Sequence, residues 1–129
     1  KSQGSDGKTE EVYRAERSSV TFNQEIVILI NQGSASASEI LAGALKHHRG
    51  SKIVGQRSFG KGSIQTLVNL SDMSNLKITI SNWVTPSGEL ITDKGISSDY
   101  EVERTVEDFD AGRDPQLDKA IEILKKTKN

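Results

Sequence analysis

The stretch "IVGQRSFGKGSIQ", residues 53–65, places Lys61 between two glycines, and the amine of this lysine could serve two kinds of chemistry. After a glycine-rich turn, a lysine can bind the phosphates of a nucleotide, if a Ser or Thr follows to hold magnesium and a helix then begins. A lysine can instead act as a general base, if burial lowers its pKa from about 10.4 toward neutrality. The neighbouring residues distinguish between these two roles.

The nucleotide role fails on two counts. Gly62 stands where the magnesium-binding hydroxyl should be, and the following "SIQTLVNL" is rich in residues that favour strands. Ser58 and Lys61 also have the Ser-x-x-Lys spacing of penicillin-binding enzymes. However, the glycines on both sides of Lys61 disfavour the helix that such a site needs, and the accompanying Ser-Asp-Asn and Lys-Thr-Gly elements are missing. An ordinary turn with an exposed lysine remains open at this point.

Three serines, Ser34, Ser36 and Ser38, offer a candidate nucleophile. They alternate with alanines where an apolar run passes into a predicted helix. The free N–H groups and the positive dipole end of such a helix suit an oxyanion. Serines before a helix are also its usual caps, so their position alone leaves a catalytic and a structural role open.

A serine nucleophile needs a base, and the usual base is histidine. The chain has only His47 and His48, at the far end of the same predicted helix. At a rise of ~1.5 Å per residue, His47 would lie roughly 16 Å from Ser36 along the helix axis. Lysine remains, and Lys61 has glycines on both sides that let the backbone approach other groups closely. Gln65, four residues later, could hold a neutral amine without restoring its charge.

The elements around these residues predict an α/β fold. The run "QEIVILINQ" is apolar at its centre, as in strands buried on both faces of a sheet, and a helix is predicted from about Ala35 to His48. Strand patterns follow in "QTLVNL" and "NLKITISNWVT". After the turn "TPSG", the segment "ITDKGI" predicts a short return strand.

The two ends of the chain carry different patterns. Residues 1–10 lack large apolar side chains and predict a loop, and "EEVYRAERSSV" predicts a weak strand. The acidic stretch 99–110 predicts a solvated connection to a C-terminal helix that Asp114 caps and Pro115 opens. The apolar stripe of this helix consists of Leu117, Ala120, Ile121 and Leu124. We therefore divide the chain into residues 1–24, a loop with a weak strand, and residues 25–129, the core.

The composition bounds the class of protein. A chain of 129 residues predicts about one domain, and its net charge of −1 gives no excess that would attract nucleic acid or an anionic membrane. The absence of cysteine excludes disulfides, thiolate zinc sites and a cysteine nucleophile. The longest apolar run, residues 26–30, is far short of the roughly 20 residues of a membrane helix. Because the sequence lacks an initiator Met and opens with polar residues, we expect an excised fragment whose targeting and neighbouring domains lie outside it.

Taken together, "GSASASEILAGAL" and "VGQRSFGKGSIQ" resemble the catalytic core of the carboxyl-terminal processing peptidases, also called tail-specific proteases. The resemblance runs over roughly residues 25–127, through "TPSG", "KGI" and "DPQLDKAIEIL". It implies a crotonase-like or Clp-protease-like α/β core, here partial, and peptide hydrolysis by a serine–lysine dyad through an acyl-enzyme, with no cofactor and no metal. The core predicted at residues 25–129 would then be the peptidase core, ending in its C-terminal helix.

Carried over position by position, the resemblance implies a role for each residue of this site. Ser36 resembles the family nucleophile, Lys61 its general base, and Gln65 the residue that orients the lysine. The amide of Ala37 would be one oxyanion donor, and the supporting glycines of the lysine loop are Gly60 and Gly62. Where the family often reads Lys-Gly-Ile-x-Pro-Asp, this chain has "KGISSD", a difference that leaves the dyad untouched.

The resemblance also implies partners and a location. Family members carry a Gly-Gly turn that supplies the other oxyanion donor, and a PDZ domain that binds substrate C-termini; neither is in these residues. The expected partners are proteins or peptides with unstructured C-termini and the PDZ domain of the complete chain, with homo-oligomerisation left open. The expected location is extracytoplasmic, in periplasm, lumen or cell envelope. The alternative is an inactive fragment, or a scaffold or binding domain that keeps the peptidase fold.

Overall fold

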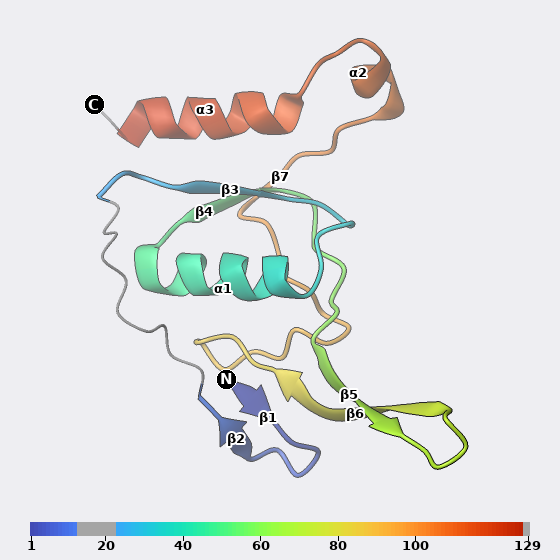
Figure 1. Ribbon diagram of the computed structural model, residues 1–129. Helices are drawn as coiled ribbons and strands as arrows, with labels where there is room; N and C mark the ends of the chain where they lie inside the picture. The colour runs from blue at the N-terminus through green and yellow to red at the C-terminus, as the bar shows by residue number, and fades with distance from the viewer. Residues whose placement is uncertain (13–22, 128–129) are drawn as a thin grey trace.

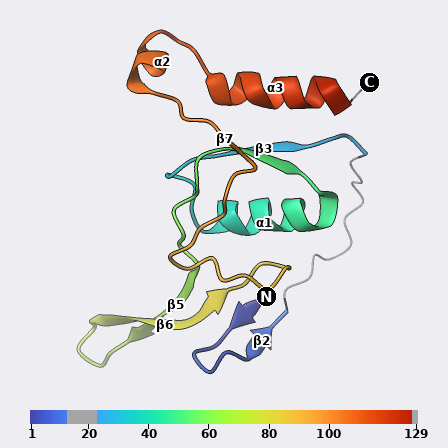
Figure 2. The ribbon, with the colours of Figure 1, turned by 180° about the vertical axis from the view of Figure 1, so that it is seen from behind.

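The computed structural model describes residues 1–12 and 23–127, and within these ranges the chain forms two sheets and three helices (Figure 1). One sheet is parallel, in the order β3-β4-β7, and consists of β3 (Val27–Ile30), β4 (Lys52–Gly55) and β7 (Tyr100–Glu101). Helices α1 (Ala37–Arg49) and α3 (Pro115–Thr127) lie on opposite faces of it, as the views from front and back show (Figure 1, Figure 2). The mixed α/β architecture predicted from the sequence is confirmed.

The apolar core lies between the parallel sheet and α1. Its buried residues are Ile30, Ala42, Ile53, Ile91 and Ile96. Because β4 is the central strand, Ile53 and Val54 are completely buried. β3 is an edge strand, and Leu29 within it is 43% exposed. The prediction that this run is buried on both faces is therefore wrong for β3; the buried strand is its neighbour β4.

Both long helices confirm their sequence predictions. α1 begins at Ala37 and ends at Arg49, and Gly50 follows in the left-handed conformation that commonly ends helices. α3 begins at Pro115, and the Asp114 carboxylate accepts a hydrogen bond from the backbone N–H of Leu117 at 2.9 Å. The stripe predicted for α3 is only partly covered, since Ala120 is buried whereas Leu117 is 46% exposed.

The second sheet is antiparallel, in the order β2-β1-β6-β5. Its strands are β1 (Ser2–Gln3), β2 (Thr9–Glu11), β5 (Ser63–Asn69) and β6 (Asn75–Trp83). The loop predicted for residues 1–10 is therefore wrong at both short strands: Ser2 pairs with Trp83, and the edge of β6 orders a segment with no strand periodicity of its own. The weak strand predicted around residues 10–20 falls mostly outside the described residues.

Strands β5 and β6 form a hairpin that projects from the rest of the chain (Figure 1). They confirm the strands predicted in "QTLVNL" and "NLKITISNWVT". On one face of the hairpin, Val68 pairs with Leu76, and Ile78 lies further along β6. These three side chains are 40%, 50% and 40% exposed.

One prediction between residues 91 and 110 is wrong: the segment "ITDKGI" is a turn rather than a strand, because the N–H groups of Lys94 and Gly95 both donate to the carbonyl of Ile91. The stretch 99–110 is exposed at most positions, as predicted, but it also contains β7 and a short helix, α2 (Val106–Asp110), capped by the Thr105 hydroxyl. Within residues 1–12 and 23–127, the longest helices fall short of the length and apolar character that a membrane crossing requires.

Candidate active site

Ser36 lies where β3 passes into α1, and its backbone has an unusual conformation. It is the N-cap residue of α1, with φ 53° and ψ −115°. These angles belong to the first central position of a type II′ turn, which glycine normally occupies because a Cβ is crowded there. Strained serines on sharp strand-to-helix turns are a known arrangement for nucleophiles. The conformation thus favours a functional serine over a simple cap.

The backbone N–H of Ala37 is positioned to stabilise an anion beside Ser36. Ala37 is the first residue of α1, a helix of 13 residues, so its N–H lies at the positive end of the helix dipole. Among the described residues this N–H has no hydrogen-bond acceptor. A free, fixed donor next to the candidate nucleophile is what an oxyanion requires.

The loop that carries Lys61 runs beside the loop that carries Ser36. After β4, the N–H of Gln56 donates to the carbonyl of Ile30 at 3.1 Å, and the N–H of Phe59 donates to the carbonyl of Ser34 at 2.9 Å. The Lys61 side chain is exposed and has no hydrogen-bond or ion-pair partner in the part of the chain that the structure describes.

Glu39, in the first turn of α1, joins these two loops through its carboxylate. Its side chain is completely buried. Oε2 accepts the backbone N–H of Ser36 at 2.8 Å and that of Lys61 at 3.0 Å. Oε1 accepts the Ser58 hydroxyl and the Gly60 N–H, both at 2.6 Å. Since one oxygen binds both N–H groups, the backbone nitrogens of Ser36 and Lys61 lie within about 6 Å of each other.

Glu39 was not among the residues that the sequence predicted for the site. One signal was present: a glutamate three residues after a serine N-cap is the spacing of a capping box, in which the glutamate accepts the N–H of the cap residue. That spacing predicts the hydrogen bond to Ser36. It cannot predict the bonds to the lysine loop, whose residues come about twenty positions later in the sequence.

The glycines around Lys61 allow a close approach of two backbones, as predicted from the sequence. A Cβ on Gly62 would lie 2.5 Å from the backbone nitrogen of Thr92, and Gly60 has a φ of 88°. The Gly60 carbonyl accepts the N–H of Asp93 at 3.0 Å. Strand β5 begins at Ser63, so no helix follows the lysine, and a phosphate-binding loop is ruled out.

The side chains predicted to form the site are not linked by hydrogen bonds in the described part of the chain. Among the described residues, the Ser36 hydroxyl and the Lys61 amine share no hydrogen bond, and Gln65 donates instead to the Thr79 hydroxyl at 3.3 Å. The backbones of Ser36 and Lys61 are brought together, whereas the dyad and the orienting role of Gln65 stay predictions. His47 lies near the C-terminal end of α1, at the opposite end from Ser36.

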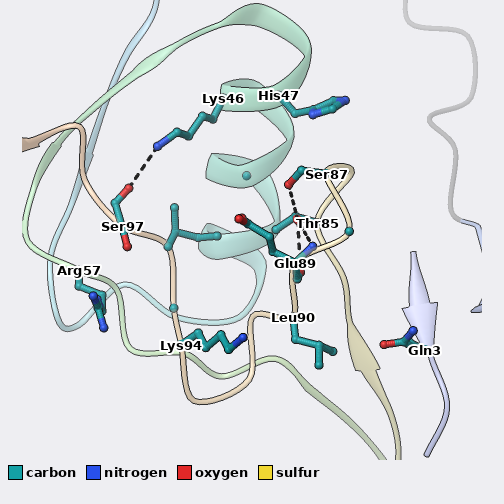
Figure 3. Close-up of a pocket in the computed structure, with 14 residues that line it drawn as sticks. Gln3, Lys46, His47, Arg57, Thr85, Ser87, Glu89, Leu90, Lys94 and Ser97 are labelled. Atoms are coloured by element: carbon teal, nitrogen blue, oxygen red, sulfur yellow. Dashed lines mark hydrogen bonds between the residues drawn. The ribbon is translucent and has the colours of Figure 1, made fainter. Parts of the chain in front are cut away.

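A pocket of about 850 Å³ lies away from these residues, between the second half of α1 and the loops around residues 85–90 and 94–97 (Figure 3). In this pocket, the Lys46 amine donates to the carbonyl of Ser97 at 3.4 Å. Its lining is rich in basic side chains, namely Lys46, His47, Arg57 and Lys94. Neither Ser36 nor Lys61 is part of it, so it is separate from the candidate site.

Comparison with known proteins assigns the chain to a family. The model of Peptidase family S41 matches residues 1–102. The chain belongs to peptidase family S41. It is 44% identical over 96 residues to a chloroplastic C-terminal processing peptidase from Tetradesmus obliquus, covering 74% of this chain and 21% of the relative. It is 39% identical over 119 residues to a carboxyl-terminal-processing protease from Synechocystis sp., covering 90% of this chain and 28% of the relative.

A solved structure agrees with this assignment. The photosystem II D1 C-terminal processing protease superposes with a TM-score of 0.60 at 47% sequence identity, over 63% of this S41 chain and 21% of that chain. The chain therefore spans between 21% and 28% of the length of these three relatives. The S41 match includes both Ser36 and Lys61.

Proposed function

We propose that this S41 chain is the catalytic core of a serine endopeptidase that cleaves proteins near their C-terminus with a Ser36–Lys61 dyad. The observation that carries the proposal is the buried Glu39 carboxylate, one oxygen of which binds the backbone N–H of both residues. Two further observations support it: the strained backbone at Ser36, and the unoccupied N–H of Ala37 beside it. The names of the curated relatives agree with this reaction.

In the proposed mechanism, the Ser36 Oγ attacks the carbonyl carbon of the scissile peptide bond, and the neutral amine of Lys61 takes the hydroxyl proton. The negative charge that develops on the carbonyl oxygen is stabilised by the Ala37 N–H. Lys61 then gives its proton to the leaving amine, and the new N-terminus departs from an ester on Ser36. Water, deprotonated by Lys61, attacks the ester carbonyl; the bond to Ser36 breaks, the carboxylic acid product leaves, and Lys61 returns its proton to the Ser36 Oγ.

The proposal requires changes in the surroundings of Lys61. Its side chain is exposed, so substrate, or protein beyond the described residues, must exclude water from it before a neutral amine is favoured. Gln65 must leave the Thr79 hydroxyl if it is to orient the lysine. A second oxyanion donor and a PDZ domain that captures unstructured substrate C-termini belong to the same proposal, as do a crotonase-like or Clp-protease-like core and an extracytoplasmic location.

A non-catalytic scaffold that keeps the S41 fold is the second candidate. Two features of the described residues favour it: the Ser36 hydroxyl and the Lys61 amine share no hydrogen bond, and Gln65 contacts Thr79 instead, whereas an assembled dyad would pair these groups. The two candidates differ in one property that can be measured. Only the peptidase needs a reactive serine that depends on Lys61.

Covalent labelling with a fluorophosphonate tests the proposal in the intact protein, with mass spectrometry to locate the adduct. We expect the wild type to be labelled at Ser36 and Lys61→Ala to lose labelling. Lys94 is the matched control, because it is also an exposed loop lysine without an ion-pair partner among the described residues. Lys94→Ala should retain labelling, since Lys94 is not part of the proposed dyad. Labelling that persists in Lys61→Ala refutes the dyad. A wild type that is never labelled, although folded, favours the scaffold.

A further inference from the structure

Glu39 is the most completely enclosed charged residue in the described part of the chain, with no exposed side-chain surface. A carboxylate withdrawn from water is stable only if its oxygens are satisfied by hydrogen bonds. Here each oxygen accepts two, from Ser36 and Lys61 on Oε2 and from Ser58 and Gly60 on Oε1. The acceptor capacity of an ionised carboxylate is thereby filled.

The nature of the donors determines what this carboxylate does. Three of the four are backbone N–H groups, and no lysine or arginine forms an ion pair with Glu39 within residues 1–12 and 23–127. A bond to a side chain would fix a side chain, whereas these bonds fix the course of the main chain. Glu39 therefore fixes the backbone positions of Ser36 and Lys61, and these positions determine what their side chains can reach.

The strained turn at Ser36 needs such a restraint. A φ of 53° and a ψ of −115° persist in a non-glycine residue only where the surroundings hold it. The N–H of Ser36 points at Oε2, and the N–H of Lys61 points at the same atom. A displacement of that oxygen would therefore move both backbones relative to each other, and misplacements of about 1 Å can reduce catalytic rates by about 10²-fold.

We propose that Glu39 is a positioning residue of the serine–lysine site: its buried carboxylate holds the nucleophile turn and the lysine loop in one fixed relation. This inference rests on the proposed function for its effect on catalysis. Its structural content, the joint fixation of the two backbones, does not depend on that function. Glu39 touches neither reacting side chain, so it acts through Ser36 and Lys61.

Glu39→Gln is the sharpest variant, because it keeps the size of the side chain while one oxygen becomes an NH₂ group that cannot accept. The two donors of that oxygen then lose their acceptor, and the bonds to the remaining oxygen weaken because the acceptor no longer carries a charge. Glu39→Asp keeps both oxygens but draws them back by one methylene. Ser58→Ala is the matched control: it removes one bond to Oε1 and one to the Ile96 N–H, and it leaves the bonds to Ser36 and Lys61 in place.

The rate of fluorophosphonate labelling at Ser36 is measured in the intact protein and divided by the folded fraction, which thermal unfolding gives for each variant. We expect Glu39→Gln to lower this corrected rate by about 10²-fold, Glu39→Asp to lower it less, and Ser58→Ala to stay near the wild type. A corrected rate in Glu39→Gln no lower than in Ser58→Ala overturns the inference, while labelling of the wild type upholds the proposed function.

Hydrogen–deuterium exchange separates the two proposals if the wild type is not labelled. In the folded wild type, the amides of Ser36, Gly60 and Lys61 should exchange slowly. In Glu39→Gln they should exchange faster together, whereas in Ser58→Ala those of Ser36 and Lys61 should stay protected. Joint loss of protection supports the positioning role even where no serine peptidase activity exists. Unchanged protection in Glu39→Gln refutes it.

Discussion

Replacing Ser36 by glycine and by alanine tests whether the backbone at this residue is strained. Both substitutions remove the hydroxyl, but only glycine adopts a φ of 53° and a ψ of −115° without crowding. Strain of this kind costs about 1–3 kcal/mol. Part of this gain is offset, because glycine makes the unfolded chain more flexible and thereby lowers stability by about 0.5–1 kcal/mol. Ser36→Gly should therefore be more stable than Ser36→Ala by about 0.5–2 kcal/mol.

Urea unfolding of the two variants of the intact protein measures this difference directly, and neither variant should be labelled by the fluorophosphonate. Ser34 provides the control, because its φ is not in the left-handed region. There the order should reverse, with Ser34→Ala more stable than Ser34→Gly. If Ser36→Gly is no more stable than Ser36→Ala, the backbone at Ser36 carries no strain, and the argument for a restrained nucleophile turn fails.

Two further substitutions test the packing around the site and one ion pair. Gly62→Ala places a Cβ 2.5 Å from the Thr92 nitrogen, so it should lower the free energy of unfolding by about 1–3 kcal/mol and slow labelling. Gly33→Ala meets only a side-chain oxygen at 3.2 Å and should change little; equal losses in the two variants would contradict this. Burial acts to raise the pKa of Asp99, but the hydrogen bond from the Lys46 amine and other favourable contacts hold it below its ordinary value of 3.8. Lys46→Met should raise this pKa in an NMR titration. Because a lowered carboxyl pKa stabilises the fold above pH 3.8 and this contribution is lost as pH falls through the folded value, wild type and variant should converge in stability at low pH. A difference that is constant from neutral to acid pH would exclude this coupling.

The elements that the sequence predicted well depend on local signals. The apolar spacing in α1 and the Asp114–Pro115 start of α3 act within a turn or two of helix, so they can be recognised without the rest of the chain. The short strand at Ser2–Gln3 has no such signal, because it pairs with β6, about eighty residues away. The cap of α2 at Thr105 was readable, but its single helical turn is too short for a periodic pattern.

The candidate site divides in the same way. Ser36 and Lys61 stood out by their local setting, a serine at a helix start and a lysine between glycines. The contribution of Glu39 is tertiary, since most of its donors reach it only after β4 has folded back beside α1. Gln65 is in β5, as predicted, but its partner there is Thr79, which the antiparallel pairing of β5 and β6 places opposite it.

The backbone bonds of the lysine loop have a consequence for mutational tolerance. The loop is held by the N–H groups at positions 59, 60 and 61, so its anchors do not depend on the side chain at position 59. Phe59 is 67% exposed and is open to exchange, whereas the positive φ of Gly60 requires glycine. Proline is the exception at position 59, because it has no N–H to donate. A library of substitutions at Phe59 can therefore vary the surface next to Lys61 while the loop keeps its course.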